Sequence, residues 1–193
     1  MAQTVRQAWV ALRVLLVMTV LVGIVYPLAV FLVGRVVPST ADGSFVTDAS
    51  GTVVGSALIG QSFHGSEWFW PRPSAAGDGY DGLASGGSNL AADNPDLVSA
   101  VAERQSAAAA ADGVAPAEVP ADAVTASGSG LDPDISPEYA LQQVTRVAAA
   151  RGLDVATVES LVADHTQGRA LGFVGEPRVN VLELNLALSQ LTP

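Results

Sequence analysis

An uncharged apolar segment near the N-terminus constrains this chain more than any other feature. Residues 14–34, between Arg13 and Arg35, contain no charged side chain. As a helix rising about 1.5 Å per residue, this segment is about 31 Å long, which matches the roughly 30 Å hydrocarbon core of a bilayer. Residues 34–38 form a poor cleavage site, which disfavours a removed secretory signal. The sequence therefore predicts a retained transmembrane helix over residues 14–37.

The arginines that flank this segment predict its orientation. Arg6, Arg13 and the terminal amine precede it, whereas Arg35 alone follows before the acidic residues begin. Because the basic flank of a membrane helix usually stays in the cytoplasm, we expect residues 1–13 to form a short cytoplasmic N-terminus. Residues 38–193 then form one extracytoplasmic soluble domain, long enough to bury its own core.

The charge of the soluble part excludes one class of partner. Residues after position 38 include six arginines and all nineteen acidic residues, a net charge of −13 with histidine neutral. Such a field repels nucleic acid and anionic lipid and attracts cations, so we expect no nucleic-acid partner. An acidic surface that simply keeps the domain soluble is the alternative explanation.

Several chemistries are excluded by residues that the sequence lacks. Without lysine there is no phosphate-binding P-loop and no Asp-Lys phosphorylation sequence of an ion-pump catalytic subunit. No Gly-x-Ser-x-Gly elbow occurs, and His64 and His165 are the only imidazoles, with no HExxH pair. Cysteine is absent as well. The sequence therefore predicts no catalytic residue, no metal site and no directly bound cofactor.

Small or helix-breaking residues recur on one face of the predicted membrane helix. Thr19, Gly23, Pro27, Val30 and Gly34 follow one another at spacings of three or four. Because helices pack closely in lipid through such faces, we expect a partner helix at Thr19, Gly23, Pro27 and Gly34. The alternative is that glycine and proline are simply common in membrane helices. Pro27 also removes an amide donor, which predicts a kink near mid-membrane.

The soluble part combines strand and helix patterns, so we expect an α/β domain. Short runs rich in β-branched and aromatic residues predict strands at residues 52–54, 56–60 and 67–73. Helix start signals occur at Asn94-Pro95, Ser136-Pro137 and Asp154, and the first two helices have stop signals at Gly113 and Gly152. Residues 181–191 fit a helix better than a strand, although alternating leucines favour the strand.

Two Ser/Gly segments each lead into a helix that starts with proline. Such loops let the backbone approach another chain or ligand closely, although tight turns without a ligand are their commoner use. We take them as candidate partner or ligand loops, formed by Ser85, Gly86, Gly87, Ser88 and Asn89, and by Ser127, Gly128, Ser129 and Gly130.

These residues resemble a known family, the C subunit of the bacterial Kdp potassium-transporting ATPase (KdpC). The matching stretches, in family order, are residues 55–61, 70–75, 85–90, 124–133 and 171–181. The departures are mild: Asp134 stands where histidine is frequent, and Trp68 where the family often has tyrosine.

The resemblance implies a noncatalytic, single-pass subunit of the bacterial cell membrane. Its implied partners are a channel-like subunit that selects potassium, the transported ion, a P-type subunit that binds and hydrolyses ATP, and often a very small fourth peptide. The family is described as a catalytic chaperone that raises the ATP affinity of the ATPase subunit, a role that would fall to residues 85–88 here. Because cytoplasmic ATP cannot reach an external loop, we expect any effect on ATP to pass through assembly or conformation.

Three acidic residues are candidates for attracting cations to a channel entrance. Asp132, Asp134 and Glu138 flank a glycine loop and a helix start. Only acids within about 8 Å of the entrance could act, because salt screens more distant charges. The alternative functions are an anchored extracytoplasmic module that binds or senses a ligand, and an anchored serine hydrolase.

Overall fold

The computed structural model describes residues 2–191, and the chain divides into two compact units that join between Ser44 and Phe45. The first unit is helical. It comprises α1 (Ala2–Val20), a π-helical turn η1 (Leu21–Val25), α2 (Tyr26–Val36) and the short α3 (Pro38–Ala41).

One continuous helix of 35 residues, Ala2–Val36, confirms the single apolar N-terminal helix that the sequence predicts. It is about 53 Å long at about 1.5 Å per residue, so it exceeds the hydrocarbon core and begins well before residue 14. None of its side chains is buried within the chain. The membrane boundaries at residues 14 and 37 stay a prediction.

A π-helical turn interrupts the long helix just before Pro27. The π-helical turn ends at Val25, two residues before Pro27, and α2 begins with Pro27 in its first turn. A π turn is a common way for a helix to absorb a local disruption of its hydrogen bonds. The structure thus has a π turn beside Pro27, and the kink near mid-membrane stays a prediction.

The second unit is an α/β domain, which confirms the predicted fold class. Its strands are β1 (Phe45–Thr47), β2 (Val53–Ser56), β3 (Asp134–Ile135), β4 (Thr166–Gln167) and β5 (Arg178–Asn180). Strands β1 and β2 form an antiparallel hairpin, and the other three form an antiparallel sheet in the order β3-β5-β4.

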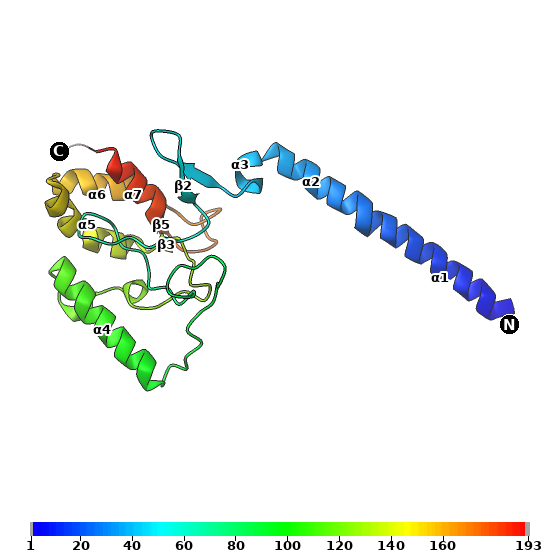
Figure 1. Ribbon diagram of the computed structural model, residues 1–193, viewed down its shortest axis with the longest axis horizontal. Coiled ribbons are helices and arrows are strands. Elements are labelled where there is room, and N and C mark those ends of the chain that lie inside the picture. The colour runs from blue at the N-terminus through cyan, green and yellow to red at the C-terminus, as the bar shows by residue number, and fades with distance from the viewer. Residues whose placement is uncertain (1, 192–193) are drawn as a thin grey trace. The chain divides into compact units, whose positions relative to one another are not determined.

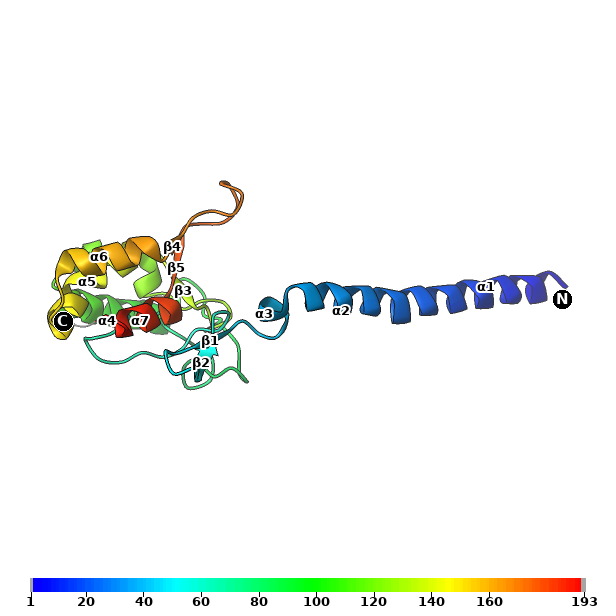
Figure 2. The ribbon, with the colours of Figure 1, turned by 90° about the horizontal axis from the view of Figure 1, so that it is seen from above.

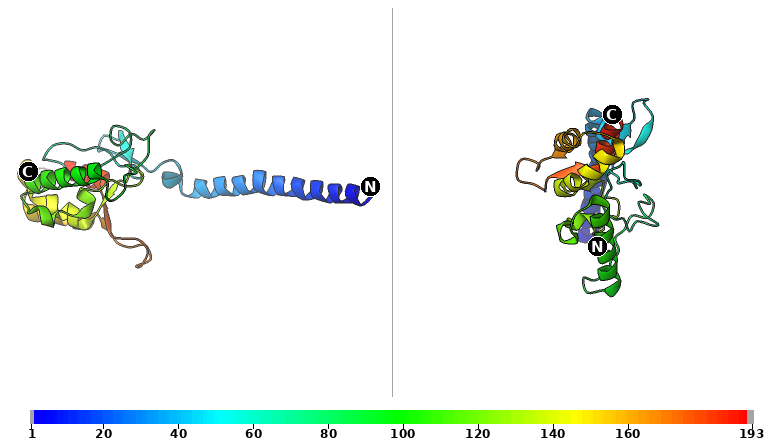
Figure 3. Two further views of the ribbon diagram at one scale, coloured as in Figure 1. Left: turned by 90° about the horizontal axis from the view of Figure 1, so that it is seen from below. Right: turned by 90° about the vertical axis from the view of Figure 1, so that its left-hand side faces the viewer.

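Within its described residues the domain contains the α-helices α4 (Pro95–Asp112), α5 (Pro137–Arg151), α6 (Val155–Asp164) and α7 (Val181–Ser189). Short 3₁₀ turns, η2 (Pro116–Glu118) and η3 (Ala121–Ala123), connect α4 to the sheet region. Helix α5 lies between α4 on one side and α6 and α7 on the other (Figures 1 and 3). The largest fully buried apolar side chains are Phe69, Val144, Val147, Val158, Val162, Val179, Val181, Leu184 and Leu188.

Local capping signals place the helices correctly. The side chain of Asn94 accepts from the Asp96 amide at 2.8 Å, and Ser136 accepts from the Tyr139 amide at 3.0 Å. Helices α4 and α5 end at Gly113 and Gly152, both in the left-handed conformation. Asp154 stands at the N-cap of α6, as predicted, but its side chain makes no capping hydrogen bond.

The helix expected over residues 181–191 is confirmed as α7. Asn180 accepts from the Glu183 amide at 3.1 Å and so caps the first turn. The alternating leucines are explained by burial on more than one face: Leu182, Leu184 and Leu188 are all buried. A helix buried so broadly loses the simple polar face that would have marked it in the sequence.

The strand predictions for residues 56–60 and 67–73 are wrong, and the prediction for 52–54 holds only in part, as β2. Residues 57–59 form a turn, and residues 67–73 belong to no strand. Pro71 and Pro73 lack the amide donors that a ladder needs. The aromatic run is nevertheless core, since Phe69 is fully buried and Trp68 packs against the core.

Side-chain amides replace a neighbouring strand along this run. Asn185 accepts from the Phe69 amide and donates to the Phe69 carbonyl, both at 2.9 Å. Gln143 accepts from the Trp70 amide at 2.6 Å and donates to the Trp70 carbonyl at 3.2 Å. We call Gln143 and Asn185 the amide clamp. It satisfies the backbone groups of Phe69 and Trp70 without a neighbouring strand.

Candidate functional site

The two Ser/Gly loops lie against each other. The Gly86 amide donates to the Ser129 carbonyl at 2.8 Å, and the Ser85 hydroxyl donates to the same oxygen at 2.9 Å. A β-carbon added at Gly87 would stand 3.2 Å from the Gly128 carbonyl oxygen. The repeated pattern in the sequence therefore corresponds to a contact within the chain.

Gly130 is the closest point of this contact. Its φ of +67° favours glycine, and an added β-carbon would lie 2.6 Å from the Gly86 oxygen and 2.7 Å from the Ala76 nitrogen. The Ser74 hydroxyl donates to the Gly130 carbonyl at 2.6 Å and accepts from the Tyr80 amide at 2.8 Å. Residues 74–80 thus hold the second loop in place.

Parts of both loops remain open to a partner. The exposed members are Ser85, Ser88, Asn89, Gly128 and Ser129. Asn89 also adopts a positive φ of 53°, which asparagine tolerates better than most residues. Whether these residues contact a partner or ligand stays a prediction.

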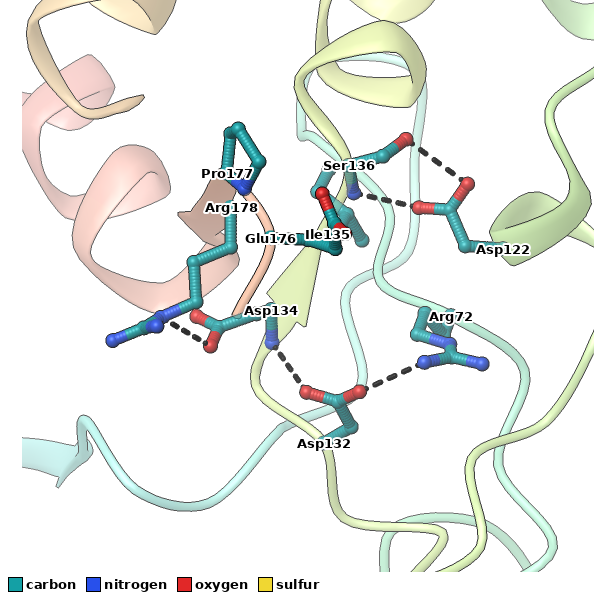
Figure 4. A pocket seen from close by; sticks show the side chains of 9 residues that line it. All are labelled: Arg72, Asp122, Asp132, Asp134, Ile135, Ser136, Glu176, Pro177 and Arg178. Carbon is teal, nitrogen blue, oxygen red and sulfur yellow. Dashed lines mark hydrogen bonds and ion pairs between the residues drawn. The ribbon is translucent and has the colours of Figure 1, made fainter. Parts of the chain in front are cut away.

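A hollow of about 340 Å³ lies beside the second loop, and arginines and carboxylates line it (Figure 4). We call it the Arg/Asp hollow. Its lining residues are Arg72, Asp122, Asp132, Asp134, Ile135, Ser136, Glu176, Pro177 and Arg178.

Two candidate acids in this hollow are paired with arginines. Arg72 donates to Asp132 at 2.8 Å, and the Arg178 Nε atom lies 3.0 Å from Asp134. Asp132 also accepts from the Asp134 amide at 3.1 Å, which fixes the two carboxylates relative to each other (Figure 4). Because each acid faces a guanidinium, the field that these two project into solvent is smaller than their formal charge indicates.

Asp134 is the electrostatically perturbed acid of the hollow. Partial burial raises the pKa of its carboxyl, and the neighbouring Arg178 guanidinium opposes this rise. The carboxylate of Asp132 adds to the rise through like-charge repulsion. The side chain is thus less readily ionised than an exposed aspartate, although it lies beside an arginine.

Asp122 anchors the opposite wall. It accepts from the Ser136 amide at 2.6 Å and from the Ser136 hydroxyl at 3.0 Å. The same hydroxyl caps α5, so the wall of the hollow and the start of α5 share one hydrogen-bond network. Glu138, the third candidate acid, is exposed in the first turn of α5 and lies outside the lining of the hollow.

The remaining candidates lie in the first unit. Thr19, Gly23 and Pro27 are exposed on the long helix, and Gly34 is half-buried. An added β-carbon at Gly23 would meet nothing within 4 Å, whereas one at Gly34 would stand 3.4 Å from the β-carbon of Ala41. Space for a close helix partner therefore exists at Gly23.

Sequence reasoning missed the arginines of the hollow. Arg72 and Arg178 are distant in sequence from the acids that they pair, so no local spacing could indicate them. Both arginines lie inside stretches that match the family, residues 70–75 and 171–181. That match is the sequence signal by which they could have been found. Among residues 2–191 no group of three potential metal-ligating side chains occurs.

Comparison with known proteins gives one consistent family. The model of the KdpC family, described as the c chain of the K⁺-transporting ATPase, matches residues 8–190. A potassium-transporting ATPase KdpC subunit of Kineococcus radiotolerans is 64% identical over 188 residues, 97% of this chain and 95% of the relative. The same-named subunits of Beijerinckia indica and Geobacter metallireducens are 52% and 51% identical, over 100% and 95% of this chain and 96% and 97% of their own lengths.

Proposed function

Because this chain belongs to the KdpC family, the c chain of the K⁺-transporting ATPase, we propose that it is a noncatalytic subunit needed for the assembly and stability of an ATP-driven potassium uptake complex. The observation that carries the proposal is the N-terminal helix. An 18-residue window of this helix has a mean hydropathy of 2.6, and the chain itself buries none of that window. Such a surface requires lipid or partner helices around it. The partners are a channel-like potassium-selecting subunit, a P-type ATPase subunit and a very small fourth peptide.

Helix packing inside the membrane gives the decisive experiment. Gly23→Leu and Gly34→Leu place a bulky side chain on the proposed packing face and should release the chain from the complex on detergent extraction. Ala29→Leu adds the same side chain on another face of α2 and serves as the control. Unchanged co-purification of both glycine variants would mean that this face points to lipid.

The proposed orientation places the N-terminus in the cytoplasm and the acidic domain outside the cell. Any influence on the ATP affinity of the ATPase subunit then passes through assembly and conformation. We expect a fragment of residues 38–193 to neither bind nor hydrolyse ATP. Calorimetry of the fragment tests this, and saturable ATP binding at physiological concentration would contradict it.

The acidic domain also serves to raise the cation concentration at the channel entrance. Replacing Asp132, Asp134 and Glu138 with Asn or Gln removes three negative charges and leaves Arg72 and Arg178 without their partners. The apparent KM for potassium should rise at low salt and change less at high salt, with kcat little altered. A control with equal charge change replaces the exposed Asp93, Asp96 and Glu103 near the start of α4. An equal KM in both variants, with assembly intact, would mean that the negative charge only keeps the domain soluble.

A further inference from the structure

The loop between β4 and β5 presents an apolar tip to solvent. Residues 168–177, which we call the finger, project away from the packed helices of the domain (Figures 2 and 3). All ten are exposed. Near the tip, Leu171 is 85% exposed, Phe173 74% and Val174 50%. Single exposed apolar residues are ordinary, but three within four positions on a projecting loop indicate an interaction surface.

The finger is internally ordered. Ala170 and Val174 form an antiparallel bridge in which each amide donates to the other residue's carbonyl at 2.9 Å. Below the bridge, Arg169 pairs with Glu176 at 2.5 Å. These contacts close the loop on itself and hold its tip outward.

The backbone at the tip presents a leucine in an unfavourable conformation. Leu171 has a φ of +54°, followed by Gly172 at +82°. The left-handed region disfavours a branched residue such as leucine and is commonly occupied by glycine. Its side chain is nevertheless almost fully exposed, so the folded domain alone gains nothing from placing leucine there. A backbone outlier of this kind, with no gain inside the chain, points to a contact outside it.

The composition of the finger and the net charge of the whole soluble part favour a protein over lipid as the occupant. The soluble part carries −13 in total, which opposes approach to anionic lipid. The finger itself contains no Trp or Tyr and a single Arg, which is balanced by Glu176. Membrane-interface segments usually combine such aromatics with clustered basic residues.

We propose that Leu171 and Phe173 are apolar anchors that insert into an apolar pocket on the extracytoplasmic face of another protein subunit of the potassium-transporting complex. The proposal rests on the proposed function, because it requires such a subunit. A preorganised loop loses little entropy on binding, and buried apolar and aromatic anchors typically dominate an interface. The base of the finger supplies Glu176, Pro177 and Arg178 to the Arg/Asp hollow, so a partner that holds the tip also reaches the hollow.

Co-purification of the full complex tests the anchors. The double variant Leu171→Ser with Phe173→Ser should lower the amount of this chain retained with its partners after detergent extraction by about tenfold. The control is Leu83→Ser with Phe45→Ser, which removes the same residue types at 99% and 65% exposure elsewhere and should match the wild type. Equal retention of both double variants would overturn the proposal.

Photo-crosslinking identifies the occupant. A photoreactive amino acid replacing Phe173 in the intact complex should give an adduct between this chain and a second subunit. Adducts with lipid alone would show that the tip inserts into the membrane and would overturn the proposal. If the wild-type chain itself fails to co-purify with other subunits, the proposed function fails. If the wild type co-purifies and the finger variant does so equally, only the finger proposal fails.

Discussion

Arg146 lies 2.7 Å from Asp112 and joins α5 to the end of α4 through an ion pair whose side chains are 6% and 0% exposed. The same guanidinium donates to the carbonyls of Ser66 and Trp68, each at 2.9 Å, and stacks 3.9 Å from the centre of the Trp70 ring. One arginine therefore fixes two helices and the aromatic segment together. Buried charges persist only when their hydrogen-bonding capacity is filled in this way.

Removing one partner of this pair should be costly. We expect Asp112→Asn to lower the free energy of unfolding by about 3–5 kcal/mol, because the Arg146 charge is left buried without its counter-charge. Urea unfolding of the fragment 38–193 measures this. Glu176→Gln in the pair with Arg169 is the control, and it should cost less than about 1 kcal/mol because that pair is exposed. Equal costs would show that burial does not govern the Asp112 pair.

The amide clamp should contribute stability through the backbone groups that it satisfies. Asn185→Leu has a similar size but leaves the buried amide and carbonyl of Phe69 without partners. Each unsatisfied group costs about 1–3 kcal/mol, so we expect a marked fall in the free energy of unfolding. Gln190→Leu, at an exposed position, is the control and should be nearly neutral. A stable Asn185→Leu variant would mean that water or a shifted backbone replaces the clamp.

Gly130 should contribute more to the contact between the Ser/Gly loops than the neighbouring glycines do. Gly130→Ala should lower the free energy of unfolding by about 1–3 kcal/mol, because alanine disfavours a φ of +67° and its β-carbon meets the Gly86 carbonyl. Gly128→Ala is the matched control, since an added β-carbon there meets nothing within 4 Å. Thermal unfolding of both variants provides the comparison. Similar melting temperatures would show that the loops separate without cost.

Two aspartates should titrate on opposite sides of the ordinary value of 3.8. Burial raises the pKa of Asp134, so the stability from its protonated form is present below 3.8 and is lost as the pH rises through the raised pKa. Hydrogen bonds from Ser50 and Thr52 lower the pKa of Asp48. NMR titration of the carboxyl carbons measures both. Arg178→Met should raise the pKa of Asp134 further, and an unchanged midpoint would remove Arg178 from this balance.

Orientation is open to a direct test because the chain contains no cysteine. Ala49→Cys, beside Asp48, should react with a membrane-impermeant maleimide in intact cells. Gln3→Cys should react only after the cells are permeabilised, because Arg6 and Arg13 hold the N-terminus inside. Labelling of Gln3→Cys in intact cells would show that the topology is the reverse of the proposed one. Cytoplasmic ATP could then contact the Ser/Gly loops directly.

Helices could be predicted well because their signals are local. Asn94, Ser136 and Asn180 each accept a hydrogen bond from an amide two or three residues away, so a short window of sequence contains the whole interaction. The strands could not be predicted in this way. β3, β4 and β5 are two or three residues long, and their pairing depends on tertiary contacts that no local pattern encodes.

The candidate site, too, could be predicted only where its signals are local in the sequence. Composition and spacing identified the Ser/Gly loops and the acids Asp132 and Asp134. They could not show that the loops face each other, or that Arg72, sixty positions away in sequence, neutralises Asp132. Long-range ion pairs depend on the fold, so a count of charges overstates the field that the acids project. The apolar tip of the finger lay inside a family-like stretch, but its exposure is visible only in the structure.

The amide clamp has a kinetic consequence for the aromatic segment. In a sheet, a backbone amide is released when a neighbouring strand moves away, whereas here the Phe69 amide is released when the Asn185 side chain leaves it, and because Asn185 is buried this requires α7 to move. Hydrogen exchange at Phe69 and Trp70 should therefore follow the local opening of α7 and α5, which carry Asn185 and Gln143. The two amides then act as separate reporters: exchange at Phe69 follows α7, and exchange at Trp70 follows α5. A partner that tightens one helix would slow one amide and leave the other unchanged.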